Sequence, residues 1–293
     1  FPLSMVCTSI GLLCGIGGAA NFNLCMGRRE PEHAKSYVGS AISMLAILGV
    51  ILCVAVQLFL RPMMLLFGAT PDVIDYACTY TRITSIGFPF LIVTIGGSNL
   101  IRADGSPKFS MLCNLVGAIV NTILDPLFIF GFGWGIRGAA IATVLAQILA
   151  LVWQFRIFSD RNELLHFRRG IYRLRRKIVR DILAIGMSPF LMNLAACFIV
   201  ILINKGLKQY GGDLMIGAYG IVNRLAFFFV MIVMGINQGM QPIAGYNYGA
   251  RQFDRVDRVL KLTIIGATCV TTLGFLIGEL APRLAVSVFT DDP

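Results

Sequence analysis

NTILDPLFIFGFGWGIRGAAIATV, residues 121–144, places an aspartate directly before a proline in a strongly apolar region of the chain. The stretches around it are long enough to cross a bilayer, for which about 20 apolar residues suffice. A bare carboxylate at membrane depth costs at least about 2.5 kcal/mol, so we expect Asp125 to take a proton, pair or bind a cation. This segment therefore indicates a membrane-spanning fold, and it contains a candidate residue for a cation site.

The composition is that of a membrane protein. Of the 293 residues, 57% are hydrophobic and 14% are charged, whereas soluble domains carry about 25% charged residues. We predict an all-α integral membrane protein, and we expect the chain to be part of a longer polytopic protein because it begins inside an apolar run. We predict eight membrane-spanning segments, at residues 1–26, 38–60, 76–101, 109–132, 138–156, 182–204, 214–244 and 262–281.

The formal net charge of +10 is distributed as in a membrane protein rather than in a nucleic-acid-binding protein, so we expect no nucleic acid partner. Most of the 25 Lys and Arg residues lie in alternate loops, at 27–37, 102–108, 156–181 and 250–261. The positive-inside rule places these loops in the cytoplasm, against an anionic inner leaflet. The loop 157–181 also spaces apolar residues by three and four, which predicts an amphipathic surface helix. It serves either as a regulatory element or as a tether between two bundles.

The residue types do not indicate an enzyme. The eight cysteines are scattered singly through apolar segments, and the two histidines, His33 and His166, lie in basic loops. Neither a Ser/His/Asp nor a Cys/His set is in view. We therefore expect no catalytic residue and no cofactor, and weigh a transporter against a channel or receptor.

An internal repeat indicates two bundles. One constant offset aligns Gly17 with Gly239, Gly27 with Gly249 and Arg29 with Arg251, and brings spans and basic loops into register. Repeats of like orientation are one of the recurring plans of secondary transporters. We predict two pseudo-symmetric six-helix bundles: 1–157, lacking its first helix, a basic linker at 158–181, and the first three helices of the second bundle at 182–293.

The residues around Asp125 suggest a cation site. Asn121 and Asp125 are four residues apart and share one face of a helix. Pro126 has no amide hydrogen, so the carbonyl of Thr122 loses its helical partner. Counting along the helices puts Thr143 at a depth where it can meet Asp125. Such oxygen ligands suit a proton or a hard cation such as sodium. The alternative is that Asp125 only caps the helix break.

Seven further polar residues inside the spans are candidates to line a cavity, although such residues also bond across helices as structural groups. Arg224 has no acidic neighbour at helical spacing, so we expect its partner on another helix. The candidates are Arg82, Asn193, Asn223, Arg224, Asn237, Gln238 and Gln241.

Four motifs resemble the multidrug and toxic compound extrusion (MATE) family: LDPLFIFG (124–131), RGAAIATV (137–144), LIRADGSPKF (100–109) and QPIAGYNYGAR (241–251). The resemblance implies a monomeric twelve-helix antiporter in a prokaryotic plasma membrane, which exports amphipathic organic cations in exchange for protons or sodium ions. It covers the second to the ninth helix of the family.

On this resemblance, Asn121, Asp125 and Thr143 match cation-site positions of the fifth and sixth family helices. The acidic residue that one branch carries on its seventh helix is absent from 182–204. The rival within the superfamily is a lipid-linked oligosaccharide flippase, which would favour a more cationic central cavity. In this sequence, by contrast, most basic residues lie in the loops that are predicted to be cytoplasmic.

Overall fold

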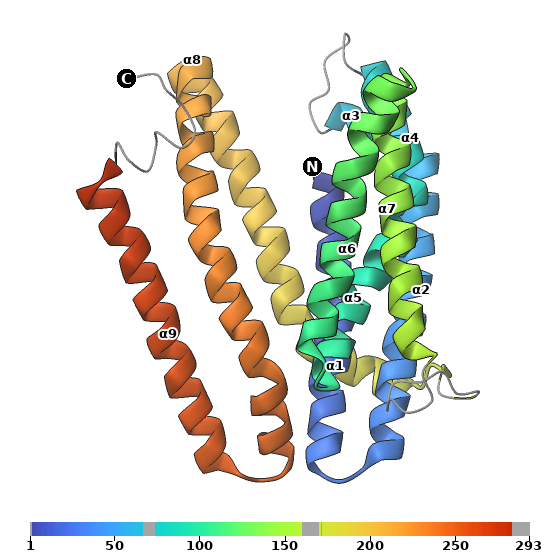
Figure 1. Cartoon of the computed structure of the whole chain (residues 1–293), viewed down its shortest axis with the longest axis vertical. Coiled ribbons are helices and arrows are strands. Elements are labelled where there is room, and N and C mark those ends of the chain that lie inside the picture. The colour runs from blue at the N-terminus through green and yellow to red at the C-terminus, as the bar shows by residue number, and fades with distance from the viewer. Residues whose placement is uncertain (1, 67–73, 160–169, 171, 283–293) are drawn as a thin grey trace. The chain divides into compact units, whose positions relative to one another are not determined.

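The computed structural model describes residues 2–66, 74–159, 170 and 172–282, and all regular elements in these ranges are helical (Figure 1). The helices are α1 (Pro2–Gly27), α2 (Pro31–Leu58), α3 (Leu60–Leu66), α4 (Ile74–Ile86), α5 (Phe88–Ala103), α6 (Pro107–Pro126), the π-helix η1 (Leu127–Gly131), α7 (Gly135–Phe158), α8 (Arg176–Gly249) and α9 (Phe253–Leu280). The prediction of an all-α membrane protein is confirmed.

Each of the eight predicted spans has a counterpart in the described part of the chain. Seven candidate spans are long and apolar enough to cross a membrane, and the pair α4 and α5 makes an eighth, bent by 52° at Gly87. The long α8 contributes two of the seven. The bend was not predicted. Pro89 accounts for it in part, because a proline cannot donate the hydrogen bond that would join the two half-helices.

The chain forms two compact units, Phe1–Leu194 and Ala195–Pro293. The division between them lies inside α8, whose first turns belong with the first unit. The predicted bundle limits at 157 and 182 rest on the sequence repeat, whereas the two compact units are defined by contacts within each unit. The predicted limits therefore stay a prediction.

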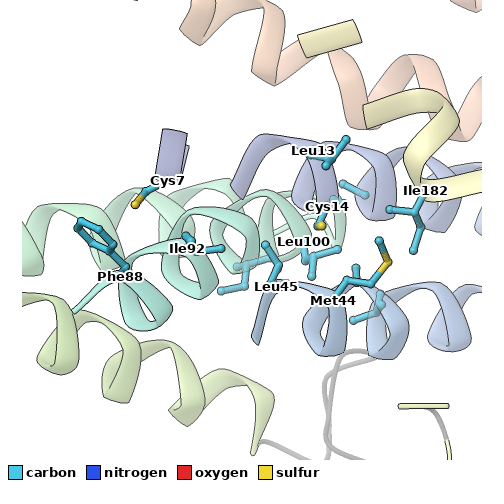
Figure 2. Close-up of a cluster of buried hydrophobic side chains, with 14 of the residues drawn as sticks. Cys7, Leu13, Cys14, Met44, Leu45, Phe88, Ile92, Leu100 and Ile182 are labelled. Atoms are coloured by element: carbon cyan, nitrogen blue, oxygen red, sulfur yellow. The ribbon is translucent and has the colours of Figure 1, made fainter. Parts of the chain in front are cut away.

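The core of the first unit lies between α1, α2, α5 and the first turns of α8. Figure 2 shows side chains of this core, among them Cys14 of α1, Leu45 of α2, Leu100 of α5 and Ile182 of α8, all with no exposed surface. Small residues let the backbones approach closely. A Cβ atom on Gly15 would lie 2.7 Å from the Cα atom of Gly96.

The helices that the repeat aligns, the second of each predicted bundle, end in the same way. Arg29 and Arg251 both adopt left-handed backbone conformations, with φ of 61° and 59°. The amides that follow them, those of Glu30 and Gln252, each donate to a carbonyl five residues back at 2.9 Å. This is the helix-ending pattern of a Schellman motif. Two aligned positions therefore share an unusual geometry, which supports the repeat.

The basic linker is only partly helical where the structure describes it. Residues 173–175 are not helical, and α8 begins at Arg176. Hydroxyls of α2 hold this stretch: Ser43 Oγ donates to the carbonyl of Tyr172 at 3.2 Å, and Ser40 Oγ to that of Arg173 at 3.3 Å. The expected amphipathic helix is therefore wrong for residues 173–175, whereas residues 176–181 are helical. Residues 160–169 and 171 of the expected helix lie outside the described ranges.

Candidate functional site

The candidate site centres on a hydrogen bond within α6. The side-chain amide of Asn121 donates from Nδ2 to Oδ1 of Asp125 at 3.2 Å. Both side chains are half-buried. The spacing of four residues brings them together as the sequence predicts, and the amide holds the carboxylate in one orientation.

The helix changes register directly after Asp125. α6 ends at Pro126, and Leu127–Gly131 form a π-helix whose end is marked by a hydrogen bond from the Phe132 amide to the Leu127 carbonyl at 3.0 Å. Pro126 cannot donate to Thr122, so the α-helical pattern cannot continue unchanged. The expected interruption is present, but the span continues to Gly131. Short π segments inside helices are frequent at functional sites.

Thr143 lies on α7, which runs antiparallel to α6 and packs against it. Two close contacts fix the register: a Cβ atom on Gly117 would lie 3.2 Å from Ala150 Cβ, and one on Gly138 would lie 2.6 Å from the carbonyl oxygen of Phe128. Interpolation between these points puts Thr143 at the level of the turn between Asn121 and Asp125. The Thr143 hydroxyl donates to the carbonyl of Ala139 at 3.0 Å, and its oxygen can still accept or ligate.

The three residues therefore share one level of the first unit, and together they supply carboxylate, amide and hydroxyl oxygens. Such a set suits a proton or a hard monovalent cation, because a carboxylate provides the charge and neutral oxygens replace water. Their role in binding a coupling ion stays a prediction.

The other candidate residues are placed as follows. Arg82 is exposed on α4, and its backbone carbonyl accepts a hydrogen bond from Gln57 Nε2 at 2.8 Å. The remaining six lie on α8. Asn193, Gln238 and Gln241 are half-buried, whereas Asn223, Arg224 and Asn237 are exposed. A cavity lined by all seven stays a prediction.

A buried polar cluster was missed by the sequence reasoning. Gln154 of α7 has no exposed surface, and its Nε2 donates to the Thr94 carbonyl at 2.8 Å and to Ser98 Oγ at 2.9 Å. Ser110 of α6 donates to the carbonyl of Ser98 at 2.8 Å, and Arg102 reaches Ser110 Oγ at 3.4 Å. The cluster joins α5, α6 and α7.

A signal for this cluster is present in the sequence. Ser110, Asn114, Asn121 and Asp125 follow one another at intervals of four and seven residues along α6. That spacing lines one helix face. The polar face runs from the candidate cation site to the buried cluster.

These helices, with one bent span and a half-buried carboxylate next to the π-helix of another span, form the fold of an all-α membrane transporter. The model of the MatE family matches residues 1–127 and 185–293, more than half of the chain, and the chain therefore belongs to the MatE family. It is accordingly a multi-pass membrane protein.

Curated relatives cover the whole chain. The multidrug export protein MepA of Staphylococcus haemolyticus is 28% identical over 294 residues, which span 100% of this chain and 64% of the relative. MepA of Staphylococcus aureus (strain NCTC 8325) is 27% identical over 295 residues, or 99% of this chain and again 64% of the relative. The chain thus spans 64% of the length of these relatives.

Solved structures are similar over the same extent. The MATE multidrug transporter DinF-BH, solved as a complex with a bound compound, is 34% identical with a TM-score of 0.89, over 100% of this chain and 66% of that one. A MATE protein in complex with MaL6 has a TM-score of 0.92 at 22% identity, over 100% of this chain and 65% of that one. The second likeness shows the fold alone.

Proposed function

We propose that the chain is part of a secondary active multidrug antiporter, which exports amphipathic organic cations in exchange for protons or sodium ions by alternating access. The export of drugs is supported by the names of relatives: MepA is a multidrug export protein, and DinF-BH is a MATE multidrug transporter. We place the protein in the plasma membrane of a prokaryote, as a monomer without a cofactor.

The observation that carries the exchange mechanism is the Asn121–Asp125 pair, whose carboxylate lies two residues before the π-helix. A carboxylate held at this depth changes its charge when it takes a proton or binds sodium. Its neighbour Pro126 cannot donate the helical hydrogen bond to Thr122, and we propose that this turn adopts a second backbone arrangement during the transport cycle. A cation that prefers one arrangement shifts the equilibrium toward it.

The energy available is sufficient for export. One charge that moves inward through about 100 mV releases about 2.3 kcal/mol. That free energy sustains about fifty-fold accumulation of one exported molecule. Each cycle therefore needs to couple only one such charge to one drug molecule.

The test is transport by the purified protein in liposomes. Efflux of a cationic dye is measured under a proton gradient alone, a sodium gradient alone and neither. We expect one of the two gradients to drive efflux and its collapse to stop it. Efflux that follows neither gradient would contradict antiport. Transfer of a lipid-linked oligosaccharide without dye efflux would favour the flippase, and uncoupled single-channel current would favour a channel.

A further inference from the structure

A cavity of about 370 Å³ lies between the first turns of α4 and the turn that leads into α7. Asp75, Tyr76 and Thr79 line it from α4, and residues 133–137 line it from the turn. Gly133 and Gly135 adopt left-handed conformations, with φ of 66° and 55°. The backbone therefore bends on both sides of Trp134 and presents the indole at the cavity. None of these residues belongs to the candidate cation site.

The cavity contains opposite charges beside aromatic rings. Asp75 and Arg137 both line it, and within the part of the chain that the structure describes they do not form an ion pair with each other. Tyr76 is 62% exposed and Trp134 is 50% exposed. A simple organic cation would be repelled by Arg137, and a simple anion by Asp75. A zwitterion can satisfy both, with phosphate on the guanidinium and an ammonium group on the carboxylate and the ring faces.

The cavity has the position expected of a site for lipid headgroups. It lies at the helix ends where α3 precedes α4, opposite the turn that joins α1 and α2 (Figure 1). Tyr and Trp are enriched at the membrane–water interface, where their rings sit at headgroup level. The volume falls in the range typical of small-molecule sites, which suits a headgroup rather than a whole lipid.

The π-helix offers a surface for acyl chains beside the cavity. Leu127 is 46% exposed and Phe130 is 82% exposed on η1, and Phe132 directly after it is 56% exposed. The rings of Phe132 and Trp134 stack with their centroids 5.3 Å apart. A headgroup bound beside Trp134 thus has apolar side chains next to it, which continue toward the membrane interior.

From these contacts we infer that the cavity binds the headgroup of a zwitterionic phospholipid, of the phosphatidylethanolamine type. Arg137 binds the phosphate, and Asp75 binds the ammonium group together with Tyr76 and Trp134. The rings of Trp134 and Phe128 are 5.5 Å apart, so a bound headgroup also restrains the π-helix that follows Asp125. The lipid is then a structural ligand of the segment next to the candidate cation site.

The experiment is native mass spectrometry of the purified full chain with defined lipids: phosphatidylethanolamine, phosphatidylglycerol and diacylglycerol. We expect selective retention of phosphatidylethanolamine. Arg137→Gln and Asp75→Asn are each expected to lower that affinity about fivefold, as for the loss of an exposed charge pair. Arg137→Lys keeps the charge and is expected to retain most of the binding.

Arg61→Gln is the matched control, because Arg61 is exposed on the neighbouring α3 and does not line the cavity. Melting temperatures without added lipid are expected to match the wild type for all variants. Equal retention of phosphatidylglycerol or diacylglycerol would overturn the inference. So would an equal loss of binding in Arg61→Gln. The last test is displacement of the lipid by tetraphenylphosphonium. If this cation displaces the lipid with the same affinity in Arg137→Gln as in the wild type, the cavity is a site for organic cations instead.

Discussion

Asn121 donates a hydrogen bond to Asp125 across one turn of α6, with Nδ2 and Oδ1 3.2 Å apart, and the helix leaves its α pattern at the next residue, Pro126. The amide fixes the carboxylate, while the π-helix beyond it follows a different hydrogen-bond register. A change of charge on Asp125 is therefore made next to the turn at which the hydrogen-bond register of the span changes.

Asp125→Asn is expected to abolish gradient-driven efflux. The substitution keeps the size of the side chain but removes the charge that a proton or sodium ion neutralises, so the conformational cycle loses its link to the gradient. Asn121→Ala and Thr143→Ala remove neutral groups and are expected to reduce efflux less. Efflux by reconstituted variants, at equal amounts of folded protein, measures these effects.

Asp257→Asn is the control for this series, since Asp257 pairs with Lys261 at 2.6 Å on the exposed part of α9. An exposed pair contributes at most about 1 kcal/mol, so efflux is expected to stay near the wild-type rate. If Asp125→Asn pumps like the wild type with an unchanged dependence on pH and sodium, Asp125 is only a structural cap.

Gly186→Ala is expected to destabilise the first unit. A Cβ atom at Gly186 would overlap the carbonyl oxygen of Leu13, a backbone atom that cannot turn away. Overpacking of this kind costs about 1–3 kcal/mol. The melting temperature in detergent is expected to fall. Gly239→Ala in the same helix α8 is the control, because a Cβ atom there has no neighbour within 4 Å. An equal fall in both variants would contradict the close packing of α1 and α8.

The locations of the spans could be predicted because a bilayer demands long apolar runs, and these are visible in a single sequence. Asn121 and Asp125 could be paired for a similar reason, since helical spacing alone brings them together. The repeat can also be detected in the sequence, and in the structure its aligned residues Arg29 and Arg251 share one backbone geometry.

The rest depends on tertiary contacts. The bend at Gly87 has a local signal in Pro89, but its helices are positioned by neighbours such as Gly49, where a Cβ atom would lie 2.8 Å from Pro89 Cα. The buried position of Gln154 likewise depends on α5, which comes much earlier in the chain. The linker carbonyls at Tyr172 and Arg173 bond to hydroxyls of α2, and no local pattern indicates that.

Arg29→Gly and Arg251→Gly are each expected to raise the melting temperature. Both residues hold a left-handed conformation, which costs a residue with a side chain about 1–2 kcal/mol and costs glycine almost nothing. Arg28→Gly removes the same charge at a position without positive φ and is expected to give no gain. A gain at one repeat position but not at the other would contradict the shared geometry.

The predicted topology places Arg173 in the cytoplasm and Arg61 on the opposite side. Single cysteines at these two exposed positions, in a protein whose eight native cysteines are replaced, are expected to react from opposite sides of the membrane. An impermeant thiol reagent added to intact cells is expected to label Arg61→Cys alone. Labelling of both positions from outside would contradict the predicted orientation, on which the proposed antiporter depends.

Pro126→Ala tests whether the altered register, and not the carboxylate alone, is needed for coupling. Alanine restores an amide that can donate to the Thr122 carbonyl, and it is the best helix former, so we expect the turn to become α-helical without loss of thermal stability. The residues of η1 would then rotate relative to α7, where Gly138 lies against the Phe128 carbonyl. We expect cation-driven efflux to fall while dye binding is kept. Efflux equal to the wild type in a folded Pro126→Ala variant would show that Asp125 acts without the π-helix, because the carboxylate and Asn121 are unchanged in it.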